Sequence, residues 1–76
     1  MKTKHFTLKD NNDDRIYVTF IFKQEEESEK IKKVVEYTIE KYPEDWEFGD
    51  IEEAIENNFD VIYTLYDNDE ENTLYI

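Results

Sequence analysis

Alternating apolar and polar positions open this chain and predict two β-strands. Residues 3–8 and 15–23 both alternate, which is typical of strands with one buried face. The second segment is expected to bury one alternating set of side chains, Ile16, Val18, Phe20 and Phe22. Residues 10–14 are all Asp or Asn. Such side chains favour a turn because they hydrogen-bond to nearby backbone. The two strands are therefore predicted to form a hairpin.

The apolar spacing then changes to a helical period. The acidic run 25–29 is predicted to open a helix with Ser28 as its N-cap, since acids suit the positive end of the helix dipole. Pro43 is expected to end this helix. One apolar stripe along it is predicted to face the core, formed by Ile31, Val34, Val35, Thr38, Ile39 and Tyr42.

A second, shorter helix is predicted from Asp50 to about residue 57. Asp50 is expected to be its N-cap, with Glu53 reaching back in a capping box, and Asn58 is a candidate left-handed stop. Residues 60–66 and 73–76 are predicted strands, joined by a turn over residues 67–72. The order ββααββ predicts one α+β domain over residues 1–76, with a four-stranded antiparallel sheet and both helices packed on one face.

The excess charge of the chain is confined to its second half. Residues 1–41 hold nine Lys or Arg and nine Asp or Glu, whereas residues 42–76 hold twelve Asp or Glu and no Lys or Arg, which gives a net charge of −12. This asymmetry disfavours direct binding to nucleic acid or to anionic membranes, because both would be repelled. It points instead to a basic protein partner.

Composition limits the other function classes. With no cysteine, the chain has no disulfide or thiolate metal site, and a cytoplasmic setting is expected. No apolar run is long enough to span a membrane, and the first residues lack the apolar stretch of a signal peptide. No cofactor is expected.

Catalytic side chains are scarce, so an enzyme is not expected. Ser28 and His5 are the only serine and histidine, and a nucleophilic site needs such a pair in contact with an orienting acid. Residues 10–14 begin like an EF-hand loop, but Arg15 stands where that loop needs glycine. Residues 67–71 begin in the same way and then run to the chain end, so they predict at most weak cation binding.

The acids of the second half fall into three clusters that form a candidate binding surface together with two aromatic residues. Trp46 is either an exposed anchor ringed by charge or a lid over the core, and Tyr17, Tyr63, Tyr66 and Tyr75 are expected to include residues on the uncovered sheet face. The candidate binding residues are Glu44, Asp45, Trp46, Glu47, Asp50, Glu52, Glu53, Glu56, Asp60, Tyr66, Asp67, Asp69, Glu70 and Glu71.

In length, in its charge of −12, in its lack of cysteine and in its base-free stretch 42–76, the chain resembles the small acidic DNA-mimic inhibitors of phages and mobile elements. Anti-CRISPR proteins, anti-restriction proteins and uracil-DNA glycosylase inhibitors belong to this class. The resemblance implies a non-enzymatic inhibitor that occupies the DNA-binding groove of a nuclease or repair enzyme in a bacterial host cell. No motif is shared, so no residue roles are carried over.

Two alternatives remain open. One is an acidic interaction module of the immunity-protein or antitoxin type, which binds a basic protein outside its nucleic-acid site. The other is an α+β domain whose acids only keep it soluble. The chain is expected to be either a monomer or a homodimer paired through its exposed last strand.

Overall fold

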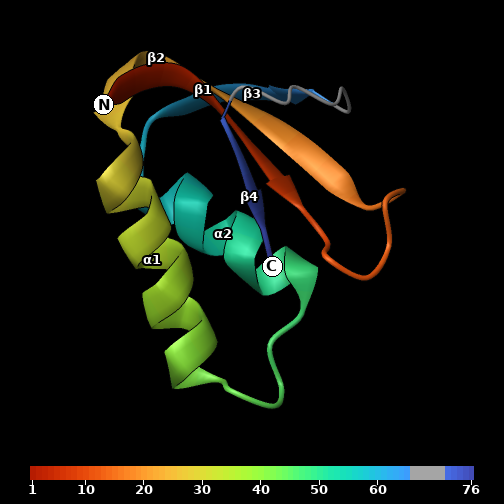
Figure 1. Ribbon diagram of the computed structural model, residues 1–76. Helices are drawn as coiled ribbons and strands as arrows, with labels where there is room; N and C mark the ends of the chain where they lie inside the picture. The colour runs from red at the N-terminus through yellow and green to blue at the C-terminus, as the bar shows by residue number, and fades with distance from the viewer. Residues whose placement is uncertain (66–71) are drawn as a thin grey trace.

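The computed structural model of this chain describes residues 1–65 and 72–76 (Figure 1). Its elements follow the order ββααββ, which confirms the expected α+β class. They are β1 (Lys2–Lys9), β2 (Tyr17–Glu27), α1 (Ser28–Lys41), α2 (Phe48–Asn58), β3 (Val61–Leu65) and β4 (Thr73–Tyr75).

The four strands form a mixed sheet in the order β3-β2-β1-β4. β1 and β2 form the predicted antiparallel hairpin, and β3 pairs antiparallel to β2. β4, however, runs parallel to β1, so the expectation of an entirely antiparallel sheet is wrong. The predicted hairpin of the last two strands is also wrong, because β3 and β4 lie on opposite edges of the sheet. In the register, Leu65 lies opposite Thr19 and Thr73 lies opposite Thr7.

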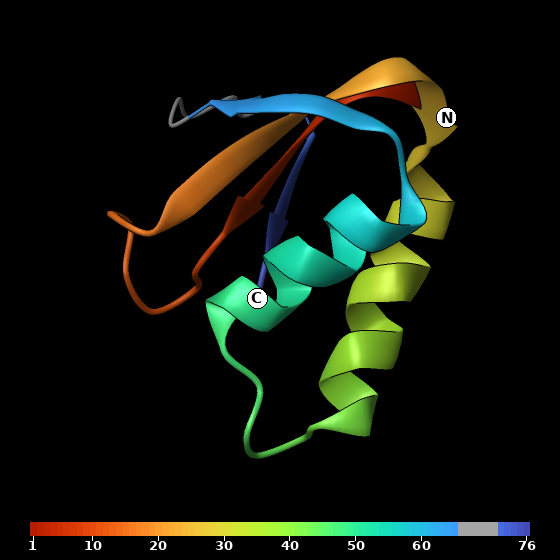
Figure 2. The ribbon, with the colours of Figure 1, turned by 180° about the vertical axis from the view of Figure 1, so that it is seen from behind.

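Both helices cover the same face of the sheet (Figures 1 and 2), as the sequence predicted. The core between the two layers is built from the alternating side chains of β1 and β2 and from one face of each helix. Its fully buried residues are Phe6, Leu8, Val18, Phe20, Phe22, Ile31, Val35, Ile51 and Ile55. Ile16, expected in this set, precedes β2 and is exposed.

The start of α1 differs from the prediction because β2 continues through the acidic run. Lys2 pairs with Glu27 and Thr3 pairs with Glu26, so the backbone there forms sheet instead of helix. The backbone N–H of Ser28 donates to the carbonyl of Met1 over 3.0 Å. Glu27, not Ser28, is therefore the N-cap residue, and its side chain makes no capping bond. The helix ends at Lys41, as Pro43 predicted.

α2 begins three residues earlier than predicted, because its N-cap residue is Glu47 and not Asp50. The capping box is formed by Glu47 and Asp50, so the predicted box of Asp50 and Glu53 is wrong. Asp50 acts from the third helical position, where its Oδ2 accepts a hydrogen bond of 2.9 Å from the backbone N–H of Glu47. At the other end, Asn58 is the last helical residue, and no described non-glycine residue has a positive φ. Its side-chain Nδ2 donates to the carbonyl of Ala54 over 2.7 Å, so Asn58 closes the helix through its side chain and the predicted left-handed stop is wrong.

Candidate functional site

α2 is the rigid support of the candidate acidic surface. Ile51 and Ile55 anchor it, since both side chains are completely buried in the core. The acidic side chains project from two sides of this helix. Asp50 and Glu53 lie on the flank that faces α1. Glu52 and Glu56 are one helical turn apart on the other flank.

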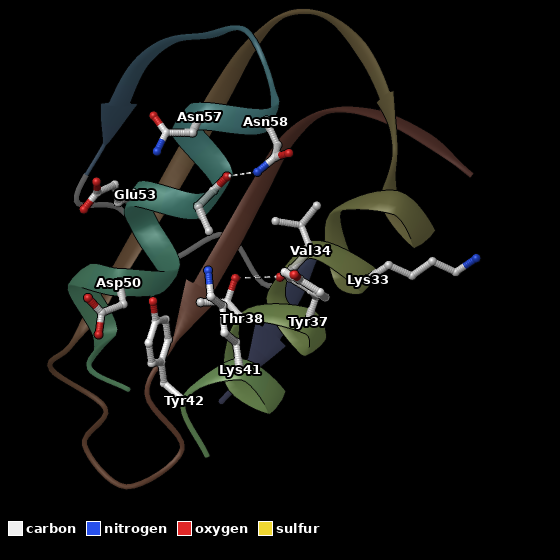
Figure 3. Close-up of a pocket in the computed structure, with 11 residues that line it drawn as sticks. Lys33, Val34, Tyr37, Thr38, Lys41, Tyr42, Asp50, Glu53, Asn57 and Asn58 are labelled. Carbon is white, nitrogen blue, oxygen red and sulfur yellow. Dashed lines mark hydrogen bonds between the residues drawn. The ribbon is translucent and has the colours of Figure 1, made fainter. Parts of the chain in front are cut away.

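The first flank forms an open groove with α1 (Figure 3), with a volume of about 500 Å³. Lys33 and Lys41 line its α1 side, while Asp50 and Glu53 line its α2 side. Figure 3 shows the Lys33 side chain extending away from α2 at the rim of the groove. Bases of the first half therefore lie beside acids of the second half in space, although the sequence separates them.

No ion pair joins the two walls of the groove among the residues that the structure describes. The described ion pairs of side chains are elsewhere, between Arg15 and Asp13 and between Lys32 and Glu29. The Lys41 ammonium instead lies 5.4 Å from the centre of the Tyr42 ring, within the range of a cation–π interaction. The groove thus presents charges of both signs to an incoming molecule.

The second flank of α2 borders a depression of about 350 Å³ that contains carboxylates and no base. Glu56 of α2, Asp60 just after α2, and Glu26 near the end of β2 supply these carboxylates. Sequence reasoning missed Glu26 because it assigned the acidic run to a helix. Strand alternation from Phe22 to Gln24 and Glu26 would have found it, since these positions share one face.

Burial raises the pKa of Glu52 above its ordinary value of 4.5, and the negative charge of Glu56 raises it further. Both causes disfavour the ionised form of Glu52.

The loop before α2 carries the remaining described acids of the candidate set. Glu44, Asp45 and Glu47 are exposed. Trp46 lies between them but is half-buried and packs against the core cluster, which agrees with the interpretation of this residue as a lid. Its backbone N–H donates to the carbonyl of Tyr42 over 3.0 Å.

Two exposed tyrosines flank the groove, and the sequence analysis did not identify them as site residues. Tyr37 is 67% exposed and Tyr42 is 45% exposed. Tyr37 lies off the apolar stripe of α1, and a large aromatic residue at such a position was the available signal. On the uncovered sheet face, Tyr63 and Tyr75 are also exposed, as predicted.

Five candidate binding residues, Tyr66, Asp67, Asp69, Glu70 and Glu71, lie outside the described residues, as do the predicted turn up to residue 71 and its candidate cation ligands. Within residues 1–65 and 72–76, no three His, Cys, Asp or Glu side chains come together in a way that would hold a metal ion. In the same part of the chain, neither helix has the length and apolar character needed to cross a bilayer.

No protein-family model matches this chain, and searches of curated proteins and of solved structures also find no match.

Proposed function

We propose that this protein is a non-enzymatic inhibitor that mimics the charge of DNA and blocks the nucleic-acid-binding groove of a basic protein. The target would be a nuclease, such as a CRISPR effector, or a repair or defence enzyme in the cytoplasm of a bacterial host cell. The proposal assigns the contact with the target to carboxylates between residues 44 and 71 and needs no cofactor or metal.

The arrangement of acids on α2 carries this proposal. Glu56, Asp60 and Glu26 line one depression, and Glu52 lies close enough to Glu56 to feel its charge, on the flank of α2 away from the lysines of α1. We call these four residues the acidic flank. Side chains four apart on a helix are about 5–6 Å apart, so Glu52 and Glu56 place two negative charges at that spacing on a rigid support. A row of phosphates presents a comparable pattern to a basic groove.

The acidic flank has no internal counter-charge among the described residues. None of its four carboxylates forms an ion pair there, and the raised pKa of Glu52 reflects burial and the proximity of Glu56. A cationic groove would relieve this repulsion on binding, and complementary charge would speed association.

The first experiment is a pull-down with immobilised protein from a bacterial lysate at low salt. Bound proteins are eluted first with duplex DNA and then with high salt, and each fraction is identified by mass spectrometry. A nucleic-acid-binding protein released by DNA supports mimicry. A specific partner released only by salt supports the acidic interaction module instead. A partner that resists both about 1 M salt and excess DNA contradicts the proposal, because screening at that ionic strength removes surface electrostatics.

Two variants with the same change in net charge then separate a defined surface from bulk charge. One neutralises the acidic flank on and after α2, E52Q/E56Q/D60N. The other neutralises exposed acids of the first half, E25Q/E36Q/E40Q. We expect only the first variant to lose binding to the captured target. Equal loss in both would mean that net charge alone drives the interaction.

A further inference from the structure

The groove between α1 and α2 differs in charge from the rest of this anionic chain. Its α1 wall has two lysines, Lys33 and Lys41, and its α2 wall has two acids, Asp50 and Glu53. Among the described residues, no ion pair joins these four side chains. The groove is therefore locally balanced in charge, whereas the whole chain carries −12.

The same groove exposes aromatic surface that nothing in the described structure covers. Tyr37 and Tyr42 both line it and are 67% and 45% exposed. Val34 and Ala54, half-buried, provide apolar lining between the two walls. Tyrosines with an apolar body and a polar tip are enriched in protein interfaces, where they bury large areas at low entropic cost.

We propose that this groove is the interface of a homodimer, in which α1 of each copy packs against α2 of the other. A two-fold axis that lies in the interface along the groove exchanges the two walls, so that the basic wall of one copy faces the acidic wall of its partner. Lys41 then lies against acids of the partner subunit, and Asp50 and Glu53 receive its lysines in return. The exposed tyrosines are buried between the four helices.

Charge complementarity favours a second copy as the occupant of the groove. A surface with one basic wall and one acidic wall is complementary to itself, because in the symmetric arrangement the basic wall of each copy faces the acidic wall of the other. Elsewhere, two copies that each carry −12 repel one another, so the balanced groove is where close approach costs least. The four residues of the acidic flank stay outside this interface, so the dimer leaves them accessible to a target, although it covers Asp50 and Glu53.

The test is the mass of the protein in solution, measured by sedimentation equilibrium up to about 1 mM protein, where even a dimer with a dissociation constant of about 1 mM is populated. About 0.15 M NaCl shortens the range of the general repulsion. We expect the mass to rise from 9.3 kDa toward about twice that value as concentration increases. A mass that stays at 9.3 kDa at the highest concentration overturns the proposal.

Charge reversal identifies the surface that is used. K33E/K41E makes both walls acidic, and E53K/N57K makes both walls mainly basic while keeping Asp50, which caps α2. We expect each variant alone to be monomeric and a mixture of the two to form a heterodimer. The matched control, K4E/K30E, has the same charge change as K33E/K41E at exposed residues outside the groove and is expected to dimerise like the wild type.

Far-UV circular dichroism of each variant checks that it remains folded before its mass is compared. Dimers that persist in K33E/K41E, or that are lost equally in K4E/K30E, overturn the groove as the interface. Persistence in all variants would instead favour pairing through the edge strand β4, the alternative that the sequence suggested. Replacing both Tyr37 and Tyr42 with Ser should raise the dissociation constant at least about tenfold, since central aromatic residues dominate such interfaces.

Discussion

The hydroxyl groups of Thr7 and Thr19 lie 2.7 Å apart and form a hydrogen bond within the sheet. Both residues are almost fully buried, although their neighbours Phe6 and Phe20 show that they point to the face that the helices leave uncovered. A polar pair thus joins the two central strands on the side away from the core. Because each hydroxyl is removed from water, the pair is sensitive to the loss of one member.

Replacing Thr19 with Val is expected to destabilise the protein by about 1–3 kcal/mol, because the buried hydroxyl of Thr7 loses its partner. The double variant T7V/T19V should recover part of this loss, since it leaves no unpaired hydroxyl at the pair. Urea unfolding of the wild type, both single variants and the double variant measures the coupling in a double-mutant cycle, and other contacts of Thr19 cancel in it. Effects that add within about 0.5 kcal/mol would contradict the coupling.

The N-terminus of α2 provides a second prediction. Asp50 accepts from the backbone N–H of Glu47 over 2.9 Å and lies in the first turn, where a negative charge is favourable. Asp50→Ala should therefore cost about 0.5–2 kcal/mol, whereas Asp50→Asn keeps the acceptor and should cost less. Chemical denaturation gives both values. Faster amide hydrogen exchange at Glu47 in the Ala variant alone would assign the loss to this bond.

The fold was predictable where one short pattern decided it. The alternation of Val18, Phe20 and Phe22 was sufficient to place β2 and its buried face, and Pro43 was sufficient to end α1. The start of α1 was not predictable in this way. The acidic run Glu25–Glu29 suits a helix N-terminus when it is considered locally, but the pairing of Lys2 with Glu27 extends β2 into this run. A contact between the two ends of a hairpin cannot be predicted from the residues around either end alone.

The prediction of the strand order was wrong for a similar reason. Residues 60–66 and 73–76 looked like a hairpin because they are close in sequence and separated by turn-forming residues. β4 instead pairs in parallel with β1, a choice that depends on which sheet edge is free. For the candidate site, the sequence identified the acids of α2, but it did not bring Glu26 to them or place Lys41 across the groove, since both come from other elements.

The partial burial of Glu52 and its proximity to Glu56 predict a pH dependence of stability. A carboxyl group with a raised pKa binds its proton more tightly in the folded state, so its contribution to stability falls as pH rises from 4.5 through the raised pKa. Glu52→Gln removes this penalty and the like-charge contact with Glu56. It should stabilise the protein at pH 7 by about 0.2–0.5 kcal/mol.

Denaturant titrations of the wild type and Glu52→Gln between pH 4 and pH 7 measure this difference, with about half-unit steps resolving a single carboxyl. The stabilisation by Glu52→Gln should shrink as pH falls. Glu44→Gln, which removes one exposed loop carboxylate, controls for the loss of one negative charge. A gain from Glu52→Gln that stays constant down to pH 4 would show that ionisation of Glu52 is not its source.

Segregation of charge also predicts that salt stabilises this protein. Residues 42–76 hold twelve acids and no base, so repulsion within this half is relieved mainly by screening. The Debye length shortens from about 30 Å at 0.01 M to about 10 Å at 0.1 M salt, and unfolding free energy should rise over this range of NaCl. E52Q/E56Q/D60N should show a flatter dependence than E25Q/E36Q/E40Q, because it removes clustered acids while its control removes acids from the half that contains all nine bases. Equal slopes for the two variants would mean that the repulsion is spread over the whole surface, and that the acids beside α2 are not under special electrostatic strain.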